Sequence, residues 1–455
     1  MTWCSRLVVV STATILTSTL LASGATAVSA QAANPFGALE VVSTPVVAGT
    51  TAVVVTVNAS HALQLTGVDP ASHKVLWRVP YSASGVTPGE YLAPAVANGI
   101  VLDAAPAANQ SNPLVRLSGI DAATGKMVWS IPSALLLSDN PAPCVENQDF
   151  CITGYNSDQS TELAVLTAST GQRTNTVSGP SRALGPNLYQ SDSSTPTLEQ
   201  LTSTGTIGWT HSATAIFGPG YDPGDGWNIW PVGSLNVGSL GATASGNSMN
   251  FGAIKTVGFS IATGTALWTV PGSYMCMGPL MFLSTHVACQ YSGTVKKPKA
   301  GATLSLKGVS LKLAGFNPTS GAVAWTQSVS SDVRAMTSGD GLRFLDDTRL
   351  VVHVPGGKSV TLNTATGTTS PVKSATILWC QKLPIYKVTA FKGEEGGGMR
   401  QSAPVYYPCT SSGMPTSKLP ANFPSTIGAT VNGVYLWASP KGLQTHTVGV
   451  SQTSA

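Results

Sequence analysis

Cysteine is the residue type whose spacing carries the clearest chemistry in this sequence. After Cys4 the chain has six cysteines, which fall into three local couples. A metal site would need thiolates in close pairs or beside histidine, and neither arrangement occurs. An even number of locally spaced cysteines instead predicts disulfides that close hairpins or loops. The predicted pairs are Cys144–Cys151, Cys276–Cys289 and Cys380–Cys409.

Other residues able to do catalytic chemistry are scattered. The six histidines show no HxH or HExxH spacing, and no GxSxG motif marks a nucleophile. The segment PGGKSV (355–360) ends like a phosphate loop, but Val352 stands where its first glycine belongs, so we expect a hairpin turn there. No catalytic, metal-binding or cofactor-binding residue is therefore assigned, no cofactor is predicted, and the protein is not expected to be an enzyme.

Two pairs of carboxylates are the weaker alternatives. Asp222 and Asp225 lie in GYDPGDGW, where they could hold Ca²⁺, but a solvated turn is the favoured interpretation. Glu394 and Glu395 are consecutive in a glycine-rich stretch. Neighbouring side chains in such a loop are poorly positioned for acid–base catalysis, so we expect a surface loop.

Aromatic residues gather in two segments rich in Gly and Pro, 215–233 and 381–409. Both are predicted to be long loops, the second inside the Cys380–Cys409 bridge. Aromatic side chains are enriched at binding hot spots, and long ordered loops are often functional. The alternative is that these rings plug a channel or cover a rim. The candidate partner-binding residues are Phe217, Tyr221, Trp227, Trp230, Tyr386, Tyr406 and Tyr407.

Residues 1–30 have the order of a secretory signal peptide. Arg6 precedes an apolar run from Leu7 to Ala22, and small residues follow up to Ala30. The run is shorter than the roughly 20 apolar residues that span a bilayer. We therefore expect cleavage near Ala30, export to the cell envelope or exterior, and no membrane span in residues 31–455. The formal charge of the whole chain is only +4, which argues against nucleic acid as a partner.

A repeated unit must position these segments. The stretch GIDAATGKMVW (119–129) has looser copies at 67–77, 165–175, 200–209, 258–268, 315–325 and 361–371. Apolar residues approach a turn, Asp, Asn, Ser or Thr opens it, and in most copies Gly closes it by accepting positive φ and a Trp follows. The unit is a β-hairpin. Strand signals upstream of several copies predict units of about four antiparallel strands.

The predicted fold is an all-β propeller in a single domain over residues 31–455. A four-stranded sheet of this kind buries neither face alone, whereas radial stacking buries both. The seven copies and a further strand pair in 429–448 give eight blades, with seven as the alternative. The segment 38–43 is predicted to pair with the last strands, in 429–448, so that both termini close the ring in one blade. The repeated tryptophans are predicted to pack against the neighbouring blade; they are Trp77, Trp129, Trp209, Trp268 and Trp325.

The repeat resembles the quinoprotein-type, PQQ-like β-propeller repeat. Asp121, Thr124, Gly125, Lys126 and Trp129 match the family pattern, and weaker copies cover most of the chain after the leader. The resemblance implies the fold but no single activity, because quinone-dependent dehydrogenases, the BamB-like scaffold of outer-membrane assembly and other secreted propellers share this repeat. The adjacent cysteine pair and the CxxCH haem motif of the dehydrogenases are absent.

Taken together, these features predict a secreted, non-enzymatic, monomeric propeller that binds a protein or an envelope polymer through its loops. The alternative hypothesis is a quinone-dependent dehydrogenase-like protein, or another enzyme, whose site is dispersed over several blades. A BamB-like assembly factor is the third. Cys4 precedes the apolar run, so it is not placed to carry a lipid anchor.

Overall fold

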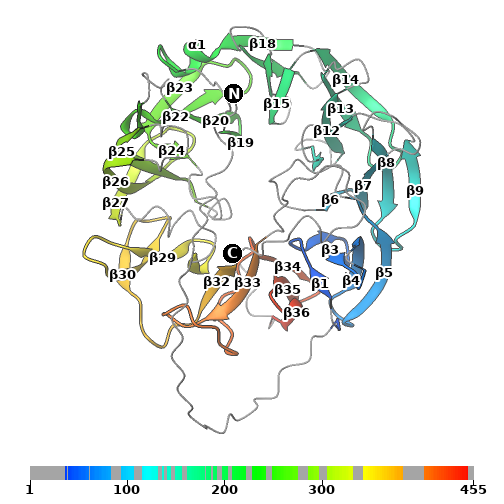
Figure 1. The fold of residues 1–455 in the computed structure, drawn as a ribbon. Coiled ribbons are helices and arrows are strands. Elements are labelled where there is room, and N and C mark those ends of the chain that lie inside the picture. Colours follow the sequence, from blue (N-terminus) through cyan, green and yellow to red (C-terminus); the bar gives the residue numbers. More distant parts are fainter. Residues whose placement is uncertain are drawn as a thin grey trace.

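Antiparallel sheets follow one another around a ring in the computed structural model, and the last sheet lies beside the first (Figure 1). The residues that the structure describes are 36–37, 39–60, 62–82, 94–106, 115–131, 136–137, 141–144, 149–155, 161–179, 181–185, 188–191, 197–202, 207–221, 228–241, 248–274, 285–296, 305–330, 342–382 and 404–448. Their strands form eight sheets, and the predicted all-β fold is confirmed. No helix in these residues is long and apolar enough to cross a membrane.

The first four sheets use consecutive strands of the chain. The first sheet holds β1 (Glu40–Val41), β2 (Val46–Ala48), β3 (Thr51–Val57), β4 (Leu63–Asp69) and β5 (Lys74–Pro80). The second holds β6 (Ala95–Ala97), β7 (Ile100–Pro106), β8 (Val115–Asp121) and β9 (Met127–Ile131). The third holds β10 (Leu136–Leu137), β11 (Ala142–Pro143), β12 (Phe150–Tyr155), β13 (Thr161–Leu166) and β14 (Arg173–Gly179). The fourth holds β15 (Ser181–Gly185), β16 (Leu188–Ser191), β17 (Thr197–Leu201) and β18 (Ile207–Ser212).

The remaining sheets are less regular. The fifth holds β19 (Asn228–Val232), β20 (Leu235–Leu240), β22 (Lys255–Ser260) and β23 (Ala266–Pro271). The sixth holds β21 (Ser248–Asn250), β24 (Ser273–Tyr274), β25 (Val287–Lys296), β26 (Ser305–Phe316) and β27 (Val323–Val329). The seventh holds β28 (Arg343–Asp346), β29 (Arg349–His353), β30 (Ser359–Asn363), β31 (Thr369–Pro371), β32 (Leu378–Lys382) and β33 (Val405–Cys409). The eighth holds β34 (Gly428–Val431), β35 (Val434–Ser439) and β36 (Gly442–Thr447). Two short helices, α1 (Ala213–Phe217) and η2 (Phe251–Ala253), complete the described elements.

Inner strands such as β3, β20 and β35 are buried on both faces because their sheets are covered by a neighbour on either side. In β3, Val53 and Val55 pack with Val101 of the second sheet, while Val54 packs with Leu436 of the last sheet. Alternate side chains of a strand point to opposite faces, so a continuous apolar run suits this position. The run TAVVVTV of β3 is buried along its whole length.

Tryptophan side chains join successive sheets, as the repeat predicts. Trp77 lies between Gly67 of its own sheet and the turn residue Gly125 of the next, where an added Cβ would stand 2.6 Å from the Trp77 Cγ. Its indole N–H donates to the Ala122 carbonyl at 2.9 Å. Equivalent indole donations join Trp129 to Ala168, Trp209 to Ile261 and Trp325 to Thr364. The predicted packing of these rings against the neighbouring sheet is confirmed.

The predicted turn of the repeat and the predicted hairpin turn at 355–360 are also confirmed. In the repeat, the Asp121 carboxylate accepts hydrogen bonds from the Thr124 N–H at 2.8 Å and the Thr124 hydroxyl at 2.6 Å, and Gly125 closes the turn with φ of 70°. The segment 355–360 turns between β29 and β30, where His353 stands opposite Ser359. It is a hairpin and not a phosphate loop.

The predicted ring closure is wrong. Glu40 of β1 stands opposite Val57 of β3, so the segment 38–43 contributes its strand to the first sheet and not to the last. The last sheet has three strands among the described residues. Side chains join the two sheets instead, because Leu39 packs in one cluster with Leu436 and Leu443. The strand that the sequence pattern assigned to the last sheet instead pairs with β3, which is close to it in the sequence.

The two predicted loops are partly regular structure. The segment 215–233 includes the end of α1 and all of β19, a strand of the fifth sheet. The segment 381–409 starts within β32 and ends with β33, which pair with each other. Only the intervening residues 383–403, together with 222–227 of the first segment, lie outside the described residues.

Candidate binding surface

The predicted partner-binding aromatics divide by burial. Phe217 and Tyr406 are each 1% exposed and belong to packed clusters of the core. Such rings cannot contact a partner directly, so these two predicted site residues are corrected to core residues. Trp227 and Tyr386 lie outside the described residues, as do Asp222, Asp225, Glu394 and Glu395.

Tyr221, Trp230 and Tyr407 are partly exposed, and each also has a packing role. The Tyr221 hydroxyl donates to the Ala253 carbonyl at 2.6 Å, and the Lys255 ammonium lies 4.0 Å from the centre of its ring. Burial raises the pKa of Tyr221 and lowers the pKa of Lys255. Trp230 meets Tyr274 edge to face at 5.5 Å. The structure does not bring these three residues into one cluster, so they remain separate candidates.

Two of the three predicted disulfides are confirmed. Cys144 is bonded to Cys151, and Cys380 is bonded to Cys409. Cys289 is also disulfide-bonded, and its predicted partner Cys276 lies outside the described residues. Disulfides form and persist in oxidising compartments, so this chemistry indicates an oxidising compartment for the protein.

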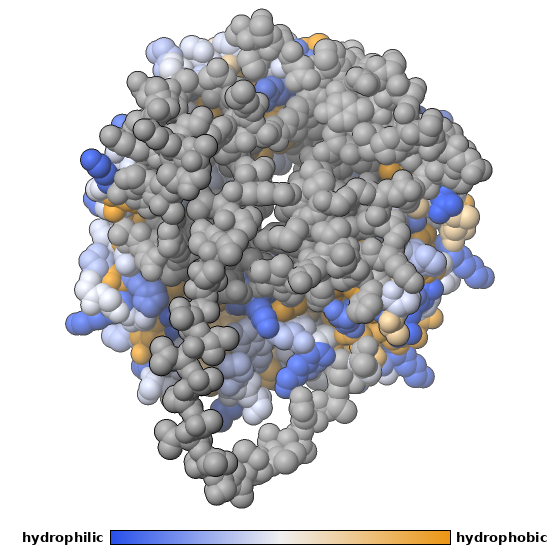
Figure 2. All heavy atoms as spheres, viewed as in Figure 1, coloured by the Kyte–Doolittle hydropathy of each residue, from blue (hydrophilic) through white to orange (hydrophobic). Residues whose placement is uncertain are grey.

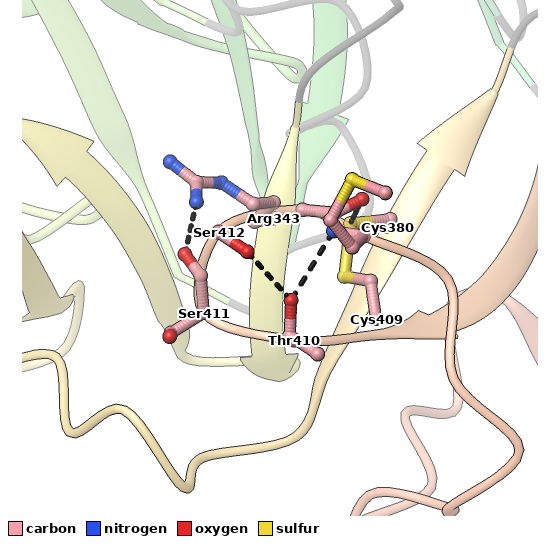
Figure 3. Close-up of a disulfide and its surroundings, with 8 residues drawn as sticks. Arg343, Cys380, Cys409, Thr410, Ser411 and Ser412 are labelled. Carbon is pink, nitrogen blue, oxygen red and sulfur yellow. Dashed lines mark hydrogen bonds between the residues drawn. A yellow bond between two sulfur atoms is a disulfide. The ribbon is translucent and has the colours of Figure 1, made fainter. Parts of the chain in front are cut away.

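The Cys380–Cys409 bridge leads directly into a long, well-fastened connection, residues 410–427, which we call the 410–427 loop (Figure 3). At its start the Arg343 guanidinium donates to the Ser411 carbonyl, and the Thr410 and Ser412 hydroxyls are 2.8 Å apart. The Thr410 N–H donates to the Met414 carbonyl at 2.8 Å. These bonds fold the first part of the loop into a tight turn against the disulfide.

The far end of the loop is fastened to Asp347, which follows β28. Its Oδ2 accepts from the Ser425 N–H at 2.9 Å and the Ser425 hydroxyl at 2.7 Å. Its Oδ1 accepts from the Thr426 N–H at 3.2 Å and the Thr426 hydroxyl at 2.6 Å. One carboxylate therefore holds two consecutive residues through four hydrogen bonds.

The residues just before Ser425 are held through two backbone carbonyls and one side-chain amide. The Trp379 indole donates to the Asn422 carbonyl at 2.8 Å, and the buried Tyr435 hydroxyl donates to the Pro424 carbonyl at 2.6 Å. The Asn422 amide donates to Asp346 at 3.2 Å. Burial alone would raise the pKa of Asp346, but hydrogen bonds from Arg349 and Thr348 outweigh it and the pKa is lowered.

Between these attachments the loop presents apolar side chains to solvent. Met414 is 65% exposed and Leu419 is 38% exposed, with exposed Lys418 beside them. Long ordered loops in compact domains are usually functional, and a loop already held in one conformation loses little entropy when it binds. The arrangement therefore holds two apolar side chains in fixed positions that face solvent.

Metal-ligating and buried acidic side chains are the remaining candidates for chemistry in the described part of the chain. No group of three or more His, Cys, Asp or Glu side chains there could hold a metal ion. Asp103 of β7 is buried next to the seam with the first sheet, and burial raises its pKa to about 6. Its Oδ1 has no hydrogen-bond partner among the described residues. A backbone hydrogen bond from Ser82 and the charge of Arg116 only partly offset the effect of burial on this carboxyl.

A family comparison bears on these observations. Residues 13–200 match the sequence model of a family described as "Outer membrane protein assembly factor BamB". The match covers less than half of the chain, and it agrees with the repeat and with the ring of antiparallel sheets. Over these residues the chain is similar to the PQQ-like β-propeller family.

Solved structures similar to this chain include two kinds of protein. BamB from Moraxella catarrhalis is 15% identical, with 80% of this chain and 96% of that chain covered and a TM-score of 0.38. The quinohemoprotein alcohol dehydrogenase from Comamonas testosteroni is 13% identical, with 85% and 77% covered and a TM-score of 0.42. A quinohemoprotein alcohol dehydrogenase from Pseudomonas putida HK5 is 12% identical, with 85% and 78% covered and a TM-score of 0.40. No curated protein matches the sequence.

Sequence reasoning missed the 410–427 loop of this propeller. A signal for it exists: Pro415, Pro420 and Pro424 punctuate a stretch without strand alternation between the strand sequences VYYPC and GATV. The attachment points gave no signal, because Asp346 and Asp347 lie far upstream in the chain.

Proposed function

We propose that this PQQ-like propeller is an exported, non-enzymatic scaffold that binds a protein partner through the 410–427 loop. The observation that carries the proposal is the pairing of firm attachment with exposure: the loop is bonded at both ends, yet Met414 and Leu419 project to solvent. Apolar side chains on a fixed support favour a protein partner over a hydrophilic envelope polymer. The disulfides and the predicted leader support export.

A specific form of this proposal is an assembly factor for envelope proteins. The match of residues 13–200 to the BamB family favours it over other binding roles. Photo-crosslinking tests both the general binding role and the assembly role, because the identity of the crosslinked partner distinguishes one from the other.

Photo-crosslinking from the loop tests the proposal. A photoreactive amino acid replaces Met414 in the full chain, and in a matched control it replaces Met127, which is 63% exposed on β9. The cells that make the protein are then irradiated. We expect a discrete protein adduct from position 414 that the double substitution Leu419→Ser and Ser411→Pro removes, since it alters the apolar side chain and the turn together. Equal adducts from positions 414 and 127, or none from 414, would refute the binding role.

The rival hypothesis is an enzyme or quinone-binding protein with a dispersed site. It is tested by titrating the purified chain with pyrroloquinoline quinone and Ca²⁺ while following the absorbance of the quinone and the melting temperature of the protein. The proposal expects no saturable change. A saturable shift in the micromolar range would replace the scaffold role with the quinone-dependent one.

A further inference from the structure

The net positive charge of the chain comes from its last quarter. Between Leu342 and Val448 the sequence has ten Lys and Arg against four Asp and Glu, whereas the whole chain has 24 against 20. The rest of the chain is therefore slightly acidic, with fourteen basic and sixteen acidic residues. The net charge of the whole chain is small, but the region that contains the 410–427 loop is basic.

The acidic groups described in this region are already engaged. Asp346 is paired with Arg349 and accepts from Asn422, while Asp347 accepts from Ser425 and Thr426. Carboxylates used in this way contribute little free negative potential to the surface around the loop. The charge that faces solvent there is consequently positive.

One exposed lysine lies in the loop, and a second lies close to the start of the loop. Lys418 lies in the loop itself, between Met414 and Leu419. Lys373 is brought alongside by its neighbour Ser374, whose carbonyl accepts from the Ser411 hydroxyl at 3.3 Å. In Figure 2 hydrophilic and hydrophobic side chains are interspersed among the coloured atoms near the first and last sheets, at the lower edge of the view. The surface thus offers single apolar contacts with ammonium groups beside them.

We propose that the 410–427 loop binds an acidic peptide segment that carries apolar side chains. The inference rests on the proposed protein-binding function and names the chemistry of its partner. Met414 and Leu419 would contact the apolar side chains, while Lys373 and Lys418 would attract the carboxylates. Charge complementarity of this kind raises the association rate and excludes cationic competitors, and the apolar contacts supply most of the affinity.

Binding of defined polymers to the purified full chain tests the inference. The probes are fluorescent random copolymers of glutamate with tyrosine and of lysine with tyrosine, polyglutamate, and vesicles of phosphatidylglycerol with phosphatidylcholine. We expect the glutamate–tyrosine copolymer to bind at least about tenfold more tightly than each other probe, because only it offers both carboxylates and apolar rings on a peptide. Equal binding of the lysine copolymer or polyglutamate would overturn the inference, and tighter binding to the vesicles would assign the surface to a membrane.

Matched variants locate the effect. The double charge reversal Lys373→Glu and Lys418→Glu should weaken binding of the glutamate–tyrosine copolymer about tenfold or more, and Met414→Ser with Leu419→Ser should do the same. The controls are Lys126→Glu and Met127→Ser, which alter exposed residues of the second sheet. An equal loss in the controls would show that binding follows net charge or general hydrophobicity, and would overturn the inference.

The two proposals fail separately. If position 414 yields a crosslinked protein whose amount is unchanged by the double charge reversal, the protein-binding role stands and the acidic partner is refuted. If position 414 yields no more adduct than position 127, the protein-binding role itself is refuted and the acidic partner with it.

Discussion

Replacing Asp347 by alanine should release the 410–427 loop while leaving the propeller folded. The four hydrogen bonds to this carboxylate, from the N–H and hydroxyl groups of Ser425 and Thr426, measure 2.6–3.2 Å. A hydrogen bond to a charged group contributes up to about 3 kcal/mol, but water replaces these partners readily because Ser425 is exposed. At somewhat under 1 kcal/mol for each bond, the loss is about 3 kcal/mol for the four.

Amide hydrogen exchange across residues 410–427 measures this loss. A destabilisation of about 3 kcal/mol corresponds to roughly a hundredfold increase in the opening equilibrium of the loop. Asp347→Asn keeps one acceptor oxygen and should give an intermediate increase. The melting temperature should fall little, because the bonds hold a connection and not the packed sheets.

A matched control is Asp121→Ala. Asp121 also accepts an N–H and a hydroxyl, from Thr124 in the repeat turn of the second sheet. Its loss should speed exchange in its own turn and leave the 410–427 loop unchanged. The reasoning is refuted if the Asp347→Ala variant exchanges like the wild type across 410–427, or if the Asp121→Ala variant speeds exchange there equally.

Three further predictions concern stability. Gly125→Ala should lower the free energy of unfolding in urea by about 2–4 kcal/mol, because Gly125 has a positive φ and the new methyl group would clash with the Trp77 indole of the preceding sheet. Gly99→Ala, at φ of 78° with no neighbouring atom in the way, should lower it by only about 1 kcal/mol. Equal losses in the two variants would contradict the close packing of the indole against Gly125. Serine at both Cys380 and Cys409 should lower the free energy of unfolding by about 3–4 kcal/mol, since the bridge spans 29 residues, and an unchanged value would show that the bridge does not constrain the unfolded chain. Burial raises the pKa of Asp103 from 3.8 to about 6, so this carboxyl binds its proton more tightly in the folded protein than in the unfolded chain. The free energy of unfolding should therefore fall by at most about 3 kcal/mol as the pH rises from 4 to 6. Asp103→Asn should remove that pH dependence and raise stability at neutral pH; a wild-type stability that does not fall over this pH range would refute the assignment.

Local chemistry made much of the fold predictable from the sequence. The Asp, Thr and Gly of the repeat turn act on residues three or four positions away, so the hairpin is encoded where it forms. The confirmed Cys380–Cys409 pair joins adjacent strands of one hairpin, which is why local pairing identified it. The repeated tryptophans were predictable for a related reason: a large ring at one position of every unit must meet the next unit in a radial stack.

Long-range packing decided the rest. Nothing near Phe217 or Tyr406 in the sequence distinguishes a buried ring from an exposed one; both are covered by sheets formed elsewhere in the chain. The first strand, β1, could have paired with either end of the ring, and the sequence pattern did not reveal its pairing with β3.

The sequence by itself determined the hairpin unit, its turns, the tryptophan contacts and the local disulfides, because each depends on residues close in the chain or on a strict repeat. Only the tertiary structure decided which aromatic residues are buried and which residues hold the loop of the proposed binding surface. The 410–427 loop is held by Asp347 and Trp379 from earlier strands, and its exposed Met414 becomes a fixed feature only once those strands are in place. The free energy of such contacts comes from groups that are distant in sequence and meet only after the sheets have packed.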